Sequence, residues 1–236
     1  TTELRRLESL RRDFVANVSH ELKTPLSSIK AYAETLLDGA LDDRQASITF
    51  VERIMEQADR LHHLILDMLS LARIESAQQV FEIVPVSIQE TVDECVANQR
   101  PAAEAKRIEL TAEPQQPGCL VRADKEGLRE ILDNLVDNAI KYTPEGGRVV
   151  VRWRSTADGK MASLEVEDTG IGISADELSR VFERFYRVDK ARSRELGGTG
   201  LGLAIVKHLA QSFGGGVSAE SESGRGSRFT VELPLA

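Results

Sequence analysis

The sequence predicts a long α-helical hairpin followed by an α+β sandwich. Through the first third of the chain, apolar residues recur at alternating steps of three and four, which is typical of bundle helices. Beyond the small polar segment 76–79, short β-like runs alternate with helical stretches. We therefore expect one domain over residues 1–77 and a second over residues 80–236.

The hairpin is predicted from two apolar seams that end and begin around one turn. Asp38-Gly39 is a helix-stop signal followed by a short polar connection, so the second helix should fold back antiparallel to the first. The seam residues are Val15, Val18, Leu22, Pro25, Ile29, Tyr32 and Leu36, then Val51, Ile54, Ala58, Leu61, Ile65, Met68 and Ala72. One hairpin cannot bury all of its apolar surface. We therefore expect two chains to form a dimeric four-helix bundle.

The second domain is predicted from short β-like runs that alternate with helical stretches. The β-like runs are Val80–Val86, Ile108–Thr111, Cys119–Arg122, Arg148–Arg154, Ala162–Glu167, Val217–Ala219 and Arg228–Leu233. The helical stretches are about Ile88–Glu104, Lys125–Tyr142 and Thr199–Phe213. Asp158-Gly159 marks a tight hairpin turn between the runs Arg148–Arg154 and Ala162–Glu167. This mixture predicts an α+β sandwich.

Composition narrows the classes of partner. A hydrophobic content of 41% supports a packed core without disulfides, and the two cysteines lack the spacing of a zinc or redox site. A net charge of −8 and 5% aromatic residues argue against nucleic acid. No apolar run reaches the roughly 20 residues of a membrane-spanning helix. We expect membrane contact only through segments absent from this fragment.

A first candidate site surrounds His20 in the first helix. Helical geometry directs His20 away from the seam and places Thr24 one turn further along the same face. Glu21 could fix the imidazole tautomer or accept a proton, since an unprotonated imidazole nitrogen is a nucleophile. Pro25 removes a backbone donor and should bend the helix here. Alone, however, an exposed histidine on a bundle helix is more often a bystander.

A second candidate site lies on the helix predicted over Lys125–Tyr142. Asn134, Asn138 and Lys141 lie together at one border of its buried stripe. An amide oxygen suits Mg²⁺, Lys141 supplies positive charge for a phosphate, and Tyr142 offers an aromatic face to a purine. The alternative is a structural helix whose asparagines lie on its solvent-exposed side and bind nothing. Asparagine is mildly unfavourable inside helices, which favours the functional interpretation.

Two glycine-containing segments complete the set of motifs. Asp168 ends a predicted strand and could accept a hydrogen bond from an adenine amino group, while Gly170 and Gly172 let the backbone approach a flat base. Further on, a glycine-rich helix start would present backbone N–H groups to phosphate oxygens. It contains Gly198, Thr199, Gly200, Leu201 and Gly202. The charged stretch before it, 187–195, is typical of a mobile lid, from which we expect Arg187 to contact phosphate.

In this order, the motifs closely resemble the H, N, G1 and G2 boxes of sensor histidine kinases. The matching stretches are His-Glu-Leu-Lys-Thr-Pro-Leu, Asn-(x)3-Asn-Ala-Ile-Lys-Tyr, Asp-Thr-Gly-Ile-Gly and Gly-Thr-Gly-Leu-Gly-Leu. Segment 181–187 is similar to the family's F box. The resemblance covers nearly the whole chain and implies a Bergerat-type ATP-binding fold after a phosphotransfer hairpin.

The resemblance also implies residue roles and partners. His20 would be the phospho-acceptor, Glu21 its base, Thr24 a phosphatase residue, Asn138 a Mg²⁺ ligand and Asp168 the adenine reader. The implied activity is autophosphorylation from ATP with Mg²⁺, transfer to an aspartate of a response regulator receiver domain, and dephosphorylation of that regulator. The implied protein is a homodimer, and this chain would be the cytoplasmic portion of a membrane-anchored bacterial sensor.

Two alternatives share part of the pattern. An ATPase or Ser/Thr kinase with the same sandwich would not need His20-Glu21 on a hairpin. A non-catalytic nucleotide-binding scaffold should have lost one of the residues Asn138, Asp168, Gly200 or His20, and all four are present. The complete motif set therefore favours a histidine kinase.

Overall fold

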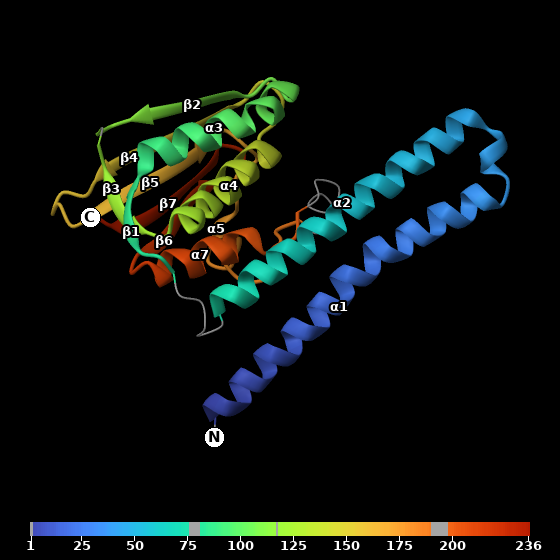
Figure 1. The fold of residues 1–236 in the computed structure, drawn as a ribbon, viewed down its shortest axis with the longest axis horizontal. Coiled ribbons are helices and arrows are strands. Elements are labelled where there is room, and N and C mark those ends of the chain that lie inside the picture. The colour runs from blue at the N-terminus through green and yellow to red at the C-terminus, as the bar shows by residue number, and fades with distance from the viewer. Residues whose placement is uncertain (1, 76–80, 117, 190–197) are drawn as a thin grey trace. The chain divides into compact units, whose positions relative to one another are not determined.

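The computed structural model describes residues 2–75, 81–116, 118–189 and 198–236 (Figure 1). The chain divides into two compact units: the first contains the two long helices as far as Ser70, and the second contains the end of the second long helix, from Leu71, and the remaining elements. A helical hairpin is thus followed by an α/β sandwich, and the predicted fold class is confirmed.

The hairpin consists of α1, Thr2–Leu37, and α2, Arg44–Glu75, joined by the short 3-10 helix η1, Ala40–Asp42. The connection turns at Gly39, whose φ of 124° favours glycine. Helix α2 begins at Arg44 because the Asp43 carboxylate accepts hydrogen bonds from the free backbone N–H groups of Gln45 and Ala46, at 2.9 and 3.1 Å. Helix α1 continues through Pro25.

The second unit is built on a five-stranded sheet in the order β2-β4-β5-β7-β6. The strands are β2, Glu109–Pro114; β4, Arg148–Ser155; β5, Met161–Asp168; β7, Gly226–Pro234; and β6, Gly216–Glu222. Strands β2 and β4 pair in parallel, and the other neighbours are antiparallel. A separate antiparallel pair joins β1, Val84–Ser87, to β3, Leu120–Ala123.

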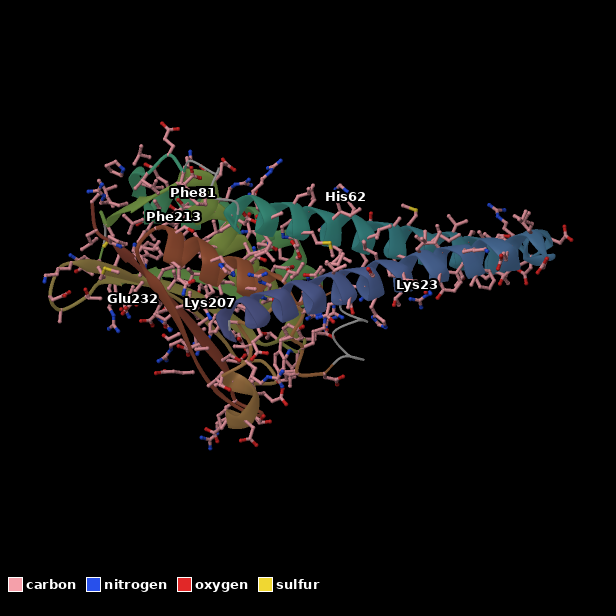
Figure 2. The ribbon with its side chains drawn as sticks, turned by 90° about the horizontal axis from the view of Figure 1, so that it is seen from below. Lys23, His62, Phe81, Lys207, Phe213 and Glu232 are labelled. Carbon is pink, nitrogen blue, oxygen red and sulfur yellow. The ribbon has the colours of Figure 1, made fainter. Side chains whose placement is uncertain are left out.

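Three helices cover one face of this sheet: α3, Ile88–Ala105; α4, Lys125–Tyr142; and α7, Gly202–Ser212 (Figure 1). The core forms between these helices and the sheet, with side chains such as Trp153, Leu132 and Ile205 fully buried. Gly127 allows α4 to approach α7 closely, since a Cβ there would lie 2.5 Å from the Phe213 ring. The Phe81 ring packs edge to face against the Phe213 ring, with 5.3 Å between the ring centroids (Figure 2).

Several predicted boundaries differ from the observed ones. The predicted strand over Val80–Val86 is observed only from Val84, where pairing with β3 begins; residue 80 lies outside the described residues. Helix α7 begins at Gly202 instead of Thr199 because Gly200, at φ 74°, is not helical. The short helix α5, Ala175–Leu178, and the parallel β2–β4 pair are not predicted by the sequence patterns.

Candidate functional site

On the hairpin, His20 is exposed and has a carboxylate beside one of its ring nitrogens. The His20 Nδ1 atom lies 3.7 Å from Glu21 Oε1, with 67% of the His20 side chain but only 14% of the Glu21 side chain exposed. The second carboxylate oxygen of Glu21 lies 3.6 Å from Nη2 of Arg60 on α2. The carboxylate therefore faces Nδ1, and Nε2 is the ring nitrogen that does not face it.

Thr24 lies one turn beyond His20, as predicted from the helical spacing. Its hydroxyl donates a hydrogen bond to the His20 backbone carbonyl at 3.2 Å. The oxygen of such a hydroxyl retains acceptor capacity. Pro25, the next residue, has a buried side chain on the same helix. The structure thus places the hydroxyl beside the histidine in sequence and in space.

In the second unit, Asn134 and Asn138 lie half-buried along α4. The Asn134 side-chain amide donates to the Glu130 carbonyl at 2.9 Å, which directs its oxygen toward the start of α7. A Cβ on Gly202 would collide with that oxygen, so the glycine is required for this approach. Helix α4 and the glycine-rich segment are therefore brought together.

The end of α4 is fixed by contacts that the sequence patterns do not reveal. Lys141 forms an ion pair with Asp137 at 2.7 Å, one turn earlier. Lys106, at the end of α3, donates from Nζ to the carbonyls of Ile140 and Lys141 at 2.6 and 3.0 Å. A cation at a helix C-terminus satisfies orphan carbonyls and complements the helix dipole. Lys106 thereby fixes the segment that carries Tyr142.

Asp168 lies at the end of β5 with only 6% of its surface exposed. Burial raises the pKa of its carboxyl to about 6, although hydrogen bonds from the backbone N–H groups of Gly170 and Ser227 oppose this shift. The bond from Gly170 to Oδ1 is 2.7 Å long. A buried carboxylate with this local support is an oriented hydrogen-bond acceptor.

The two glycines after Asp168 are required by close backbone contacts. A Cβ on Gly170 would lie 2.6 Å from the carbonyl oxygen of Tyr142, so this residue brings the loop against the end of α4. Gly172 has a φ of 66°, and a Cβ there would collide with the Glu222 carbonyl. Ile171 donates to the Tyr142 carbonyl at 3.2 Å. Backbone contacts thus hold the loop of Asp168, Gly170 and Gly172 against Tyr142 at the end of α4.

The glycine-rich segment contacts the segment that resembles an F box. Gly200 has a φ of 74°, and a Cβ there would lie 2.9 Å from the Phe185 carbonyl carbon. Phe185 itself has a φ of 61° and donates from its backbone N–H to the Gly200 carbonyl at 2.7 Å. Gly198 and Thr199 are half-buried, Leu201 is buried, and α7 follows directly. Arg187 is half-buried after Phe185, whereas most of the lid predicted over residues 187–195 lies outside the described residues, from residue 190 on.

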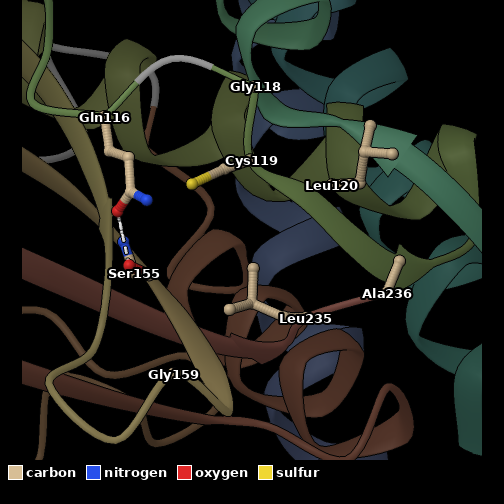
Figure 3. Close-up of a pocket in the computed structure, with 8 residues that line it drawn as sticks. All are labelled: Gln116, Gly118, Cys119, Leu120, Ser155, Gly159, Leu235 and Ala236. Atoms are coloured by element: carbon tan, nitrogen blue, oxygen red, sulfur yellow. Dashed lines mark hydrogen bonds between the residues drawn. The ribbon is translucent and has the colours of Figure 1, made fainter.

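One open hollow is not part of this constellation (Figure 3). It is lined by Gln116, Gly118, Cys119, Leu120, Ser155, Gly159, Leu235 and Ala236. Ser155 pairs with Ala162 at the start of β5, whereas Asp168 ends that strand, so the hollow lies at the opposite end of the sheet. It therefore carries none of the predicted site residues.

The described part of the chain lacks two further features. None of its helices combines the length and apolar character needed to cross a membrane. Within the same residues, no group of three or more His, Cys, Asp or Glu side chains could hold a metal ion.

Comparisons with known proteins match both units. Residues 10–77 match the family model of the His Kinase A (phospho-acceptor) domain, and residues 123–236 match the histidine kinase-, DNA gyrase B-, and HSP90-like ATPase. The sensor-like histidine kinase SenX3 of Mycolicibacterium smegmatis is 42% identical over 233 residues, which are 99% of this chain. The chain spans 60% of the length of SenX3.

Two solved structures are also similar. The crystal structure of full-length ShkA in complex with AMPPNP is 33% identical, with a TM-score of 0.69 over 95% of this chain and 46% of that chain. The crystal structure of histidine kinase ThkA in complex with response regulator protein TrrA is 22% identical, with a TM-score of 0.80 over 98% of this chain and 64% of that chain. The latter likeness shows the fold.

Proposed function

The chain belongs to the sensor histidine kinase family, and from that premise we propose that it transfers the γ-phosphoryl group of ATP to His20. The observation that carries the proposal is the exposed imidazole with Glu21 on its Nδ1 side. The phosphoryl group would then pass to an aspartate of a response regulator receiver domain. ShkA bound to AMPPNP and ThkA bound to TrrA support ATP and a regulator as the two substrates.

The proposed reaction begins at Nε2. Its lone pair attacks the γ-phosphorus of ATP, a P–N bond forms, and the bond from that phosphorus to the β,γ-bridging oxygen breaks to release ADP. The imidazole would become cationic during this step. Glu21, 3.7 Å from Nδ1, accepts the Nδ1 proton and leaves a neutral phosphorylated ring.

The matched ATPase domain provides the proposed nucleotide site. The Asp168 carboxylate accepts a hydrogen bond from the adenine amino group, and the backbone N–H groups at the start of α7 bind phosphates. Arg187 and Lys141 add positive charge there, after Lys141 exchanges its contact with Asp137 for one with phosphate. Gly170 and Gly172 support the base-binding loop, and Tyr142 offers its ring to the purine.

Mg²⁺ fits the donor set on α4. This ion takes few protein ligands and completes its octahedron with water and phosphate oxygens, so an amide oxygen on a half-buried helix face is suitable. Asn138 would hold the ion, with Asn134 in its surroundings. Bound there, Mg²⁺ would neutralise phosphate charge.

We also propose that the hairpin dimerises. Seam residues Val15, Val51 and Ile65 remain 43–55% exposed in the single chain, and large apolar residues beside the seam are exposed as well. Among these, Leu26 and Met55 are 60% and 61% exposed. Apolar area of this kind is normally covered in a stable protein, and a second hairpin would complete a four-helix bundle.

Thr24 supports a second activity on the same helix face. Its hydroxyl, held by the His20 carbonyl at 3.2 Å, is positioned to orient a water toward a phosphorylated aspartate docked beside His20. Thr24→Ala should therefore retain labelling of His20 while dephosphorylation of purified phospho-regulator slows strongly. Equal loss of both activities would make the hydroxyl structural, and no loss of either would remove it from the mechanism.

The proposed setting is the cytoplasmic portion of a membrane-anchored sensor. This follows from the family and from the limited share of SenX3 that the chain covers. The full-length protein fractionated from cells should sediment with membranes. A full-length protein found only in the soluble fraction would contradict the anchoring proposal.

The experiment for the main proposal is incubation of the chain with γ-labelled ATP and Mg²⁺. We expect label on the protein that is lost in acid and survives in base, as a phosphoramidate does. His20→Gln should abolish it without changing nucleotide affinity, and Asn138→Ala should abolish it without unfolding the chain. Label that persists in His20→Gln would overturn the assignment of the acceptor.

A further inference from the structure

The carboxylate of Glu21 lies between two partners on two helices. Its Oε1 is 3.7 Å from His20 Nδ1, and its Oε2 is 3.6 Å from Nη2 of Arg60. Only 14% of the Glu21 side chain and 10% of the Arg60 side chain are exposed. The histidine beside them is 67% exposed. The shielded ion pair therefore lies directly beside the reactive, solvent-facing ring.

Arg60 differs from Arg53 of the same helix in what it contacts. Arg53, one heptad earlier, is 57% exposed and forms its ion pair with Glu56 on its own helix at 2.9 Å. Such exposed pairs contribute little to stability. Arg60 instead reaches from α2 to a carboxylate on α1. In a shielded environment, a guanidinium restricts the orientation of its carboxylate partner more strongly than a surface pair does.

We propose that Arg60 is a positioning residue for the phosphorylation of His20. It holds Oε2 of Glu21, and the geometry of the carboxylate then presents Oε1 to Nδ1. The proton acceptor is thereby fixed on one side of the ring and Nε2 is kept available on the other. This inference rests on the function proposed above and adds a residue that acts on the reaction through Glu21.

The physical expectation concerns the rate of the chemical step. A general base contributes on the order of a hundredfold or more to a proton transfer, and a displacement of about 1 Å can remove much of that contribution. Arg60 lies beside the acceptor and is not among the residues proposed to bind nucleotide. Its loss should therefore lower kcat and leave KM for ATP unchanged.

The test compares initial rates of His20 labelling in wild type, Arg60→Met, Arg60→Lys and Arg53→Met. We expect kcat to fall at least about tenfold in Arg60→Met, with KM unchanged. Arg60→Lys, which keeps the charge but not the planar fork, should recover part of the rate. Arg53→Met, the control on the same helix, should behave like wild type. Thermal unfolding and ATP affinity report whether each variant is folded.

A double-mutant cycle distinguishes positioning from a general structural effect. If Arg60 acts through Glu21, then Arg60→Met should add no further loss in a Glu21→Gln background. Wild-type kcat in Arg60→Met, or a full additional loss in the Glu21→Gln background, would overturn the inference. A wild-type chain that takes no label on His20 would instead refute the proposed function, and the inference would fall with it.

Discussion

At the residue scale, the buried environment of Asp168 sets the pKa of its carboxyl and, with it, the pH dependence of the adenine recognition proposed above. Burial raises the pKa of this carboxyl to about 6, compared with about 3.9 for an aspartate in an unfolded chain. The folded state therefore binds a proton more readily than the unfolded state. As the pH rises from about 4 to 6, this group alone lowers the free energy of unfolding. The reason is that the folded state then has to bury an ionised carboxylate, whereas the unfolded state exposes it to water.

Adenine recognition should depend on pH in the opposite direction. Protonated Asp168 loses acceptor capacity toward an adenine amino group and gains a donor that suits the guanine carbonyl. We predict that the ratio of ADP to GDP affinity falls about tenfold between pH 7 and pH 5, since about one tenth of the carboxyl is ionised one unit below a pKa of 6.

The ratio of the two affinities reports on recognition of the base alone, because both nucleotides carry the same phosphates and ribose. Isothermal titration calorimetry with the wild type and with Asp168→Asn provides the comparison. In the variant, whose side chain does not titrate, the ratio should be low and constant with pH. A wild-type ratio that stays constant over this range would contradict the role of Asp168.

Residue types and motif order were sufficient to propose His20, Asn138 and Asp168, but not Arg60 and Lys106. Arg60 contacts Glu21 from another helix, and Lys106 contacts the end of α4 from the end of α3. Which residue of one helix faces a given residue of another depends on how the helices pack, and periodicity within each helix does not contain that information. Their only sequence signal is a cation near a predicted helix surface, which many lysines and arginines share.

At the element scale, the junction of the glycine-rich segment with Phe185 makes a specific prediction. Gly200→Ala would add a Cβ 2.9 Å from the Phe185 carbonyl carbon and would strain a φ of 74°. We expect ATP affinity to fall at least about tenfold as the N–H groups proposed to bind phosphate move, since a single displaced charge-assisted hydrogen bond contributes about 1.5–3 kcal/mol.

Gly159, in the β4–β5 turn, is the matched control for this prediction. Its φ is 66°, but a Cβ there would meet nothing within 4 Å. Gly159→Ala should lower the free energy of unfolding by about 1 kcal/mol through the left-handed backbone alone and leave ATP affinity unchanged. Equal ATP affinity of Gly200→Ala and wild type in calorimetry would show that the contact with Phe185 does not shape the nucleotide site.

Elements with clear end signals were predicted more accurately than elements whose limits depend on pairing. Helix α4 has the predicted bounds because Asp124 caps its start, with Gly127 N–H donating to the carboxylate at 3.0 Å, and Pro144 follows its end. The parallel β2–β4 pair was not predicted because a strand's own alternation does not identify its neighbours. For the same reason, β1 was predicted too long.

At the scale of the whole molecule, the proposed dimer can be tested in solution. Ile54→Asp or Leu61→Asp places a charge in the predicted seam, where an uncompensated buried charge costs several kcal/mol. We expect either variant to become monomeric or to unfold the hairpin in sedimentation and circular dichroism. Leu41→Asp, in the connection between the helices and 60% exposed, is the control and should remain dimeric. Wild type that sediments as a monomer at roughly tens of micromolar would contradict the bundle.

The family was identified from the whole pattern because no single motif is specific. A histidine followed by a carboxylate, two asparagines on a helix, and two glycine-rich turns each occur in many proteins. Their fixed order along one chain is what indicates a histidine kinase, and the two matching family models confirm that prediction. The role of each site residue remains a proposal that rests on the contacts described above.

The central claim is that Nε2 of His20 accepts the γ-phosphoryl group of ATP. The most direct test is phosphorus and nitrogen NMR of the phosphorylated chain, which identifies both the residue and the ring nitrogen that carries the phosphoryl group. Because Glu21 occupies the Nδ1 side of the ring, we predict a single phosphohistidine at His20, phosphorylated on Nε2. A phosphoryl group on Nδ1 would contradict the role of Glu21, and one on any other residue would contradict the proposed function.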